Sequence, residues 1–179
     1  IVFALDFSEA SGNTTQSIGI SPPIVNYTIN DHTPEGKHGY AAYFMAASGM
    51  RVPSSTGIQL SSPKNYTVEL WVKPTDDFTS VGIFGKTQYG LYANESGVLI
   101  WNATYEYNTT STAGTSPLLL NNWTHIAITH DVDNTTRLYV NGSLENTQIN
   151  NGTMDTSGNT LTLGAGGGSS LFNGTIDSF

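Results

Sequence analysis

The chain has 179 residues, of which 37% are hydrophobic and only 11% charged, and its formal net charge is −8. It is too hydrophobic and too aromatic for a disordered protein. Its six lysines and arginines are too few for a nucleic-acid-binding protein or for docking on an anionic membrane surface. No signal peptide and no apolar run of membrane-spanning length is present, so we expect no direct membrane insertion and interpret the chain as a mature protein or an excised domain.

Strand patterns recur from the start of the chain, and no segment has a helical period. The opening segment IVFALDF predicts a strand, whereas the polar stretch 8–33, which contains Pro22-Pro23, is predicted to be the least structured part and to wrap a sheet edge. Residues 66–73 alternate cleanly, with Glu69, Trp71 and Lys73 on one face of the predicted strand. Pro74 should end that strand because it lacks the N–H that a ladder needs.

The second half of the chain continues the pattern. Asn141-Gly142 predicts a type I′ hairpin turn, and residues 164–170 predict a glycine-rich loop. Further strands are predicted at residues 81–84, 89–93, 98–101, 123–130, 137–140, 143–149, 161–163 and 171–179. About a dozen short strands without helices predict an all-β fold, an antiparallel two-sheet sandwich or jelly roll, as a single domain over residues 1–179.

Three segments carry a family resemblance: YTVELWVKP, NNWTHIAITHDVDNTTRLYVNG and FNGTIDSF. In this order and at this spacing they resemble the laminin-G-like jelly-roll domains of the concanavalin A-like lectin/glucanase superfamily. ALDFSEASG and GKHGYAAYF resemble the opening strands of that family more loosely. The resemblance implies two stacked antiparallel sheets, a module of a larger surface protein, and roles in carbohydrate binding, adhesion or structural packing.

The same resemblance implies a structural calcium site. Asp177 matches the aspartate of the closing Ile-Asp motif, and Gly39 matches a glycine whose carbonyl is often a ligand. A carbonyl of residues 7–9 would complete the set. The chain departs from the family pattern at Ser8 and Met45, where aspartate is common and would supply calcium ligands. The alternative role for Asp177 is to cap backbone N–H groups.

Asparagines in the N-glycosylation pattern Asn-x-Ser/Thr, here called sequons, are in large excess. Eleven are present and nine use threonine, where chance would give roughly 4. They are Asn13, Asn26, Asn65, Asn94, Asn102, Asn108, Asn122, Asn134, Asn141, Asn151 and Asn173. We expect N-linked glycans on an extracellular protein. Three of the sequons, Asn122, Asn141 and Asn173, have an alternative role as turn or strand residues.

Cysteine is absent, which favours an archaeal cell surface or one of its viruses over a disulfide-bonded animal domain. A sequon-rich domain of a larger eukaryotic protein is the alternative.

Catalytic and metal patterns are weak. The Glu-x-Asp-x-x-Glu run of superfamily glucanases is absent, Glu69 stands alone on its strand, and Glu106 lies between tyrosines. The four histidines have no zinc-binding spacing. We therefore predict that the chain is not an enzyme.

Aromatic residues offer a second kind of site. Trp101, Tyr105 and Tyr107 alternate after a strand and could stack on sugar rings; the alternative is that they support an edge strand beneath glycans at Asn102 and Asn108. Trp71 and Trp123 are interpreted as core or second-layer residues.

The sequence thus predicts a non-catalytic, heavily N-glycosylated extracellular module for adhesion or structural assembly in an S-layer, filament or virion surface. Its expected partners are neighbouring copies or other surface proteins. The first alternative is a calcium-dependent carbohydrate-binding module, and the second is a glucanase-like glycoside hydrolase.

Overall fold

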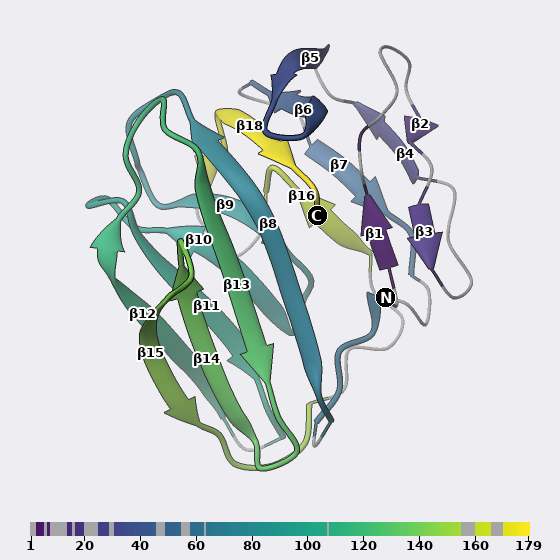
Figure 1. The fold of residues 1–179 in the computed structure, drawn as a ribbon. Helices are drawn as coiled ribbons and strands as arrows, with labels where there is room; N and C mark the ends of the chain where they lie inside the picture. Colours follow the sequence, from purple (N-terminus) through teal and green to yellow (C-terminus); the bar gives the residue numbers. More distant parts are fainter. Residues whose placement is uncertain are drawn as a thin grey trace.

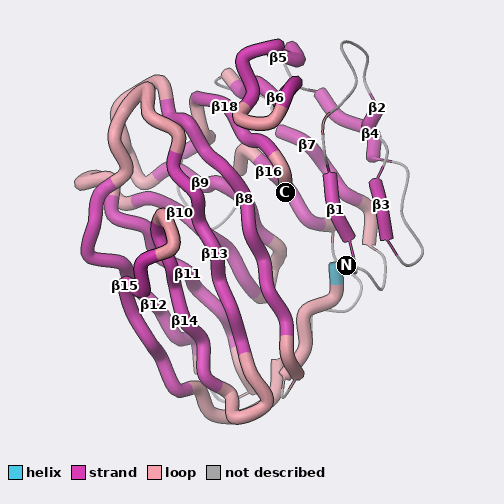
Figure 2. Tube along the Cα trace, viewed as in Figure 1, coloured by secondary structure: helices cyan, strands magenta, loops and turns pink. Residues whose placement is uncertain are grey.

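A computed structural model gives the architecture, and strands make up nearly all of its regular structure (Figures 1 and 2). It describes residues 3–5, 7, 14–15, 17–19, 25–28, 31–45, 49–54, 58–62, 64–106, 108–154, 160–165 and 170–179. These residues contain no α-helix. The prediction of an all-β, two-sheet sandwich is confirmed.

One sheet has seven strands, and all of its neighbouring pairs are antiparallel. In spatial order they are β15 (Ser143–Ile149), β14 (Thr135–Val140), β13 (Thr124–His130), β8 (Tyr66–Pro74), β18 (Gly174–Asp177), β6 (Gly39–Phe44) and β5 (Asp31–Gly36). The short β18 pairs with β8 only over residues 71–74. Residues 66–70 of β8 therefore have no strand partner on that side within the described part of the chain.

The other main sheet has nine strands. Its order is β12 (Thr109–Pro117), β11 (Val98–Thr104), β10 (Tyr89–Ala93), β9 (Val81–Gly85), β16 (Leu161–Leu163), β7 (Gly49–Val52), β4 (Val25–Thr28) and β2 (Thr14–Thr15). The ninth strand, β17 (Ser170–Leu171), pairs with β9 in parallel. A separate pair is formed by β1 (Phe3–Leu5) and β3 (Ser17–Gly19).

Some of the predicted strands and turns agree with the structure and others do not. The alternation of residues 66–73 is confirmed, and β8 extends one residue further to Pro74. Asn141 and Gly142 both have positive φ, at 49° and 80°, as a type I′ turn requires. The prediction of little structure over 8–33 is wrong for its described residues, since β2 and β4 there extend one edge of the nine-stranded sheet. The polar β12 was not predicted.

The core lies between the two large sheets, and aromatic side chains occupy its centre. In β11 the odd-numbered positions from 99 to 103 are buried, because successive side chains of a strand point to opposite sides. Trp101 is only 1% exposed and stacks on Tyr89, with ring centroids 5.4 Å apart. Phe84 contacts both Trp101, at 6.0 Å, and Phe179, at 5.1 Å. Truncating such a ring costs about 3–5 kcal/mol.

At one edge of the sandwich the two sheets are joined by hydrogen bonds from β12 to β15. The Glu145 carboxylate accepts from the backbone N–H groups of Thr115, at 2.7 Å, and Ser116, at 3.0 Å, and from both hydroxyls. The Asn146 amide donates to the carbonyl of Ala113 at 2.7 Å. The hydroxyls of Thr115 and Ser116 lower the pKa of Glu145 to about 2. We call this group of contacts the edge clamp.

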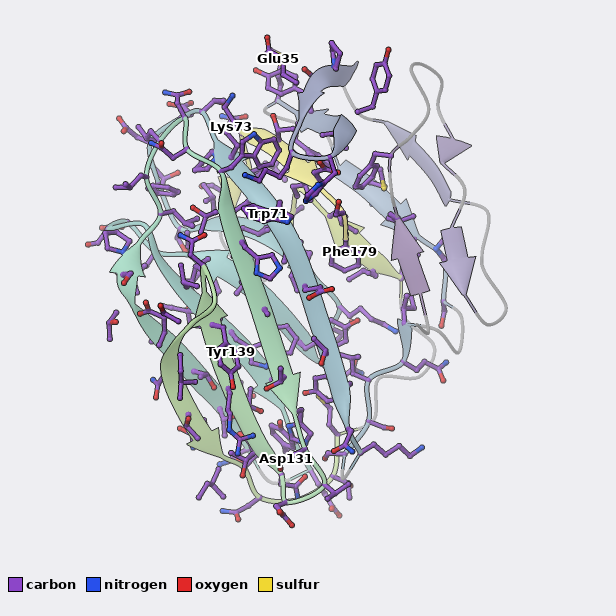
Figure 3. All side chains as sticks on the ribbon, in the orientation of Figure 1. Glu35, Trp71, Lys73, Asp131, Tyr139 and Phe179 are labelled. Carbon is purple, nitrogen blue, oxygen red and sulfur yellow. The ribbon has the colours of Figure 1, made fainter. Side chains whose placement is uncertain are left out.

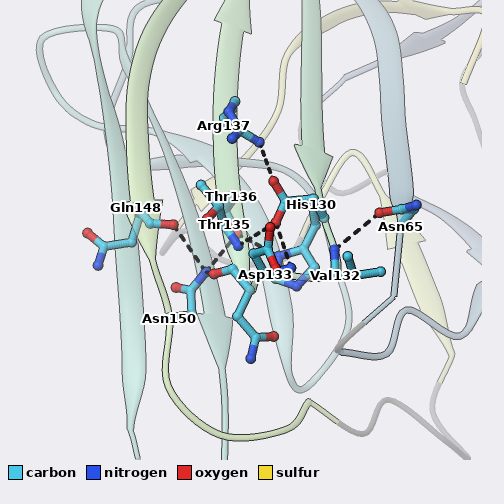
Figure 4. A network of polar contacts seen from close by, with 11 residues as sticks. Asn65, His130, Val132, Asp133, Thr135, Thr136, Arg137, Gln148 and Asn150 are labelled. Atoms are coloured by element: carbon cyan, nitrogen blue, oxygen red, sulfur yellow. Dashed lines mark hydrogen bonds and ion pairs between the residues drawn. The ribbon is translucent and has the colours of Figure 1, made fainter.

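A buried polar network surrounds the connection between β13 and β14 (Figure 4). His130 is 2% exposed and stacks on Tyr66, with ring centroids 4.8 Å apart. Its Nδ1 lies 3.0 Å from the Thr136 hydroxyl, which also accepts from the Asn150 amide at 2.9 Å. Burial lowers the pKa of His130 below its ordinary value. The imidazole is therefore held in its neutral form.

We expect the substitution Glu145→Gln to lower the free energy of unfolding by about 1 kcal/mol at neutral pH, because charge-assisted hydrogen bonds are lost at a partly exposed site. The folded pKa is lowered from 4.5 to about 2, so this stabilisation is present above pH 4.5 and is lost as the pH falls toward 2. Urea unfolding of both proteins across this range measures the effect. A difference that stayed constant down to the lowest pH would contradict it.

His130 predicts a second pH dependence, at higher pH. Because its folded pKa lies below 6.5, its contribution is complete above that pH and decreases as the pH falls. We expect the melting temperature of the wild type to fall between about pH 7 and pH 5, and His130→Gln to flatten this slope. Equal slopes in wild type and His130→Gln would refute the assignment.

Candidate binding face

The outer face of the seven-stranded sheet consists of the side chains that point away from the core. In β8 the alternation exposes Glu69, Trp71 and Lys73 on this side, while the positions between them are turned inward or buried. Antiparallel pairing sets His125 of β13 directly opposite Trp71. Figure 3 shows Trp71 and Lys73 on this side of the sheet, with Tyr139 of β14 further along it.

Trp71 is the centre of a cluster of polar contacts. The Lys37 ammonium lies 4.5 Å from the centre of its ring system, in cation–π geometry. The ring of His125 lies 5.0 Å away and that of His38 5.9 Å away, centroid to centroid. His125 Nε2 lies 3.8 Å from a carboxylate oxygen of Glu69. We call these five residues the Trp71 cluster.

Asp177 fixes the part of the cluster that comes from the β5–β6 hairpin. Its side chain is fully buried, although it lies on the outer face of β18. Oδ2 accepts a hydrogen bond from the backbone N–H of His38 at 2.8 Å, and Oδ1 accepts one from the Ser178 hydroxyl at 3.1 Å. Asp177 therefore has the capping role that the sequence offered as its alternative.

Within the described residues these contacts do not fit a calcium ion; residues 8 and 9, whose carbonyls were candidate ligands, lie outside that part of the chain. Calcium takes 6–8 oxygen ligands, whereas here an N–H group points at the one carboxylate that the family pattern supplies. Gly39 directly follows the hairpin turn as the first residue of β6, and its φ of +107° is a conformation that favours glycine regardless of any ligand. No group of three or more His, Cys, Asp or Glu side chains within the described ranges could hold a metal. We derive no step through calcium.

A cleft of about 890 Å³ opens beside the residues of β8 that β18 leaves uncovered. Aromatic side chains lie within its lining, and exposed polar side chains complete it. They include Phe84, Tyr89, Phe179, Lys64, Asn65 and Glu69. Glu69 also belongs to the Trp71 cluster, so the cleft and the cluster are adjacent. A concave site of this size with a few polar groups is typical of small-ligand binding.

The aromatic residues predicted to bind sugar are not on this face. Trp101 is 1% exposed and Tyr105 is 3% exposed, so both rings pack inside the sandwich and neither can stack on a sugar at the surface. This placement corrects the expectation of an exposed aromatic row. Tyr107 lies outside the described residues. Trp123, just before β13, is half-buried.

Trp71, interpreted from the sequence as a core or second-layer residue, does not lie in the core: it is half-buried on the outer face, beneath contacts from Lys37 and His38. A signal for its position was present. Trp71 shares its strand face with Glu69 and Lys73, and two charged neighbours at i±2 indicate solvent. Nothing local indicated Lys37 and His38, which reach the ring from another hairpin.

The sequons are distributed unequally between the sheets. The strands of the seven-stranded sheet contain none, whereas Asn26 lies in β4 and Asn102 in β11 of the other sheet. Connections between strands hold Asn65, Asn94, Asn108, Asn122, Asn134, Asn141, Asn151 and Asn173. Asn13 lies outside the described residues. Glycans at these positions would surround the seven-stranded sheet without attaching to its strands.

The two carboxylates that line the cleft are poorly placed for glycoside hydrolysis. Glu69 lies directly opposite Ala127 of the neighbouring strand. Asp131 is four residues beyond Ala127, so it lies about 13 Å further along the strand direction than Glu69. Glycosidase carboxylates lie about 5–9.5 Å apart. Asp131 also accepts a hydrogen bond from Arg137 at 2.7 Å, which lowers its pKa and disfavours a role as an acid.

Among the described residues no helix is long and apolar enough to cross a membrane.

Comparison with solved structures identifies similar folds, all at low sequence identity. The binding domain of Paraclostridial Mosquitocidal Protein 1 matches with a TM-score of 0.79 and 16% identity over 99% of this chain and 47% of that one. Domain 4 of AbnA, an extracellular arabinanase from Geobacillus stearothermophilus in complex with arabinotriose, gives 0.66 and 21% over 99% and 89%. The binding domain of Botulinum neurotoxin DC in complex with SialylT gives 0.70 and 12% over 99% and 45%.

The chain thus spans about half the length of the two toxin domains and most of the arabinanase domain. These similarities to solved structures show the fold of the chain. A search of curated proteins found no match. A family model, described as the concanavalin A-like lectin/glucanases superfamily, matches residues 45–179, which is most of the chain. The protein belongs to the laminin-G-like family of the concanavalin A-like lectin/glucanases superfamily.

Proposed function

We propose that this protein is a non-catalytic, N-glycosylated extracellular module that binds carbohydrate through the Trp71 cluster and the adjacent cleft. Adhesion at a cell or virion surface is the role that follows. The single observation behind the proposal is the outer face of the seven-stranded sheet, whose strands hold no sequon and which presents a half-buried tryptophan among polar side chains. The sequon residue Asn65 lies in the lining of the cleft, so a glycan there would restrict the cleft and leave the Trp71 cluster as the main contact. Sugar recognition commonly combines an apolar aromatic face with hydrogen-bonding groups beside it.

Two similar structures support carbohydrate as the ligand class, since one is a complex with arabinotriose and the other a complex with SialylT. The separation of Glu69 from Asp131 supports binding without hydrolysis. Calcium dependence is not part of the proposal, because the surroundings of Asp177 do not fit the ion.

Assembly with neighbouring copies is a second candidate function. The same sequon-free face favours it, because a protein interface needs an area without glycans. An archaeal cell surface or virion stays our proposal for the location.

Side-chain geometry supports glycosylation at some sequons more than at others. A glycan attaches to Nδ2, so that atom should be free. In Asn94 the other amide atom, Oδ1, accepts from the backbone N–H groups of Ser96 and Val98, both at 3.0 Å, and Nδ2 makes no hydrogen bond with the described residues. Asn141 likewise uses Oδ1, accepting from the backbone N–H of His125 at 3.0 Å. Its role in the turn is therefore compatible with a glycan.

Two other sequons use Nδ2 within the fold. Asn122 Nδ2 donates to the carbonyl of Leu120 at 2.9 Å, and Asn173 Nδ2 donates to the Asp76 carboxylate at 3.1 Å. The Oδ1 atom of Asn173 is also buried. A glycan at Asn173 would have to disturb these contacts, which supports its alternative role as a structural asparagine.

We expect Trp71→Ala to weaken binding of the best glycan on an array at least about tenfold, the change produced by losing roughly 1.4 kcal/mol. Tyr92→Ala is the matched control, because Tyr92 is a half-buried aromatic residue of β10 in the opposite sheet. Binding should be the same with and without EDTA. A blank array for the wild type, combined with self-association in sedimentation that Trp71→Ala abolishes, would replace carbohydrate binding by assembly.

Glycopeptide mapping of protein from a glycosylating host tests the modification. Asn151 and Asn173 form a matched pair, since both stand in Asn-Gly-Thr, yet Asn151 is exposed and makes no side-chain hydrogen bond within the described structure. We expect Asn151 to be occupied substantially more than Asn173. Equal occupancy would show that the folded environment of Asn173 does not limit modification.

A further inference from the structure

We infer that the ligand of the Trp71 cluster is an acidic sugar, whose carboxylate is bound between Lys37 and Lys73. This inference rests on the proposed function and specifies its ligand class.

The charge distribution is the first argument. The chain has fourteen acidic residues against six lysines and arginines, so a cation of this protein has many potential partners. Within the described residues, however, the two ion pairs are His125–Glu69 and Arg137–Asp131. Four cations, Lys37, Arg51, Lys64 and Lys73, have no carboxylate partner there, and two of them, Lys37 and Lys73, lie beside Trp71. Two unpaired cations on one face of an acidic protein indicate an anionic ligand.

The positions of the two lysines are the second argument. Lys73 follows Trp71 by two residues on the same side of β8, about 7 Å along the strand. Lys37 comes from the β5–β6 hairpin and lies 4.5 Å from the centre of the same ring system. The Lys37 ammonium thus lies against the tryptophan from one element, and Lys73 stands next to it on the same side of another. A sugar ring stacked beside Trp71 would place a carboxylate substituent within reach of both.

The charged residues around Trp71 determine which way an acidic sugar would be oriented in the site. Glu69 lies toward the cleft and is paired with His125, whereas Lys73 lies on the other side of Trp71 along the strand. Glu69 would therefore repel a sugar carboxylate at the end of the cluster beside the cleft, whereas Lys37 and Lys73 would attract it at the other end. An acidic sugar would point its carboxylate to the hairpin side and its neutral part to the cleft.

The competing explanation is that Lys37 only packs on Trp71 and stabilises the hairpin. A cation–π contact at an exposed site is worth about 0.5–1 kcal/mol, enough for a purely structural role. Such a role would affect acidic and neutral ligands alike. A charge-specific role would affect only acidic ones, and this difference defines the test.

The test measures binding of two matched probes, oligogalacturonate and its methyl ester, to the full chain at low ionic strength. The ester keeps the sugar rings and removes the charge. We expect the acid to bind at least about fivefold more tightly, and Lys37→Met and Lys73→Met each to reduce that preference about threefold, in the range of exposed ion pairs. Sialyllactose and lactose serve as a second pair, to separate the two sources of sugar carboxylate.

The control variant is Arg51→Met, which removes one positive charge from an exposed position of β7 in the opposite sheet. It should leave the preference unchanged. Equal affinities for acid and ester, or equal loss of both in the lysine variants, would overturn the acidic-sugar inference while leaving carbohydrate binding in place. Absence of binding to either pair and to every neutral sugar on the array would overturn the proposed function as well.

Discussion

One buried carboxylate determines the arrangement of the candidate binding face. Asp177 ends β18 and is covered by the hairpin whose His38 N–H it binds. A buried carboxylate without donors would be costly, and a buried N–H without an acceptor would be costly too, so each group stabilises the other. Because this contact ties residues 38 and 177 together, Lys37 and His38 reach the ring of Trp71. The loops of the proposed site are thus fixed by an interaction beneath it.

The two large sheets have different surroundings. Sequons occupy strands of the nine-stranded sheet and the connections at both ends of the sandwich, whereas the strands of the seven-stranded sheet lack them. A glycan is bulky and hydrated, so each sequon that carried one would remove surface from contact with a partner. Under the proposed glycosylation, the acceptor sites would therefore outline a binding surface without reference to any ligand. The aromatic and charged residues of the Trp71 cluster fall within that outline.

Much of the fold could be predicted from the sequence, because the strands that build its centre alternate strongly. The pattern of β8 and the Asn141-Gly142 turn are local features, and both are present. The polar β12 has no such pattern, since it is an edge strand whose partners are β11 and the Glu145 carboxylate. Sequence alone could not reveal it, because the stabilising contacts come from elsewhere in the chain.

The site was harder to predict than the fold. Asn102 is a candidate glycosylation site, so its side chain must face solvent. Because side chains alternate along a strand, its neighbour Trp101 must then face the core. This argument was sufficient to exclude Trp101 from the surface. The same argument would have placed Trp71 outside, beside Glu69 and Lys73. The contact of Lys37 with Trp71 could not be foreseen, because it depends on a hydrogen bond between residues 139 positions apart.

The edge clamp also affects how the sandwich can move. Local openings of a native protein begin where hydrogen bonds and packing are fewest. Glu145 and Asn146 hold the two sheets together at the β12–β15 edge, while residues 66–70 of β8, beside the cleft, lack a strand partner in the described structure. By this criterion, we expect local opening to begin at β8 beside the cleft and to reach the β12–β15 edge last.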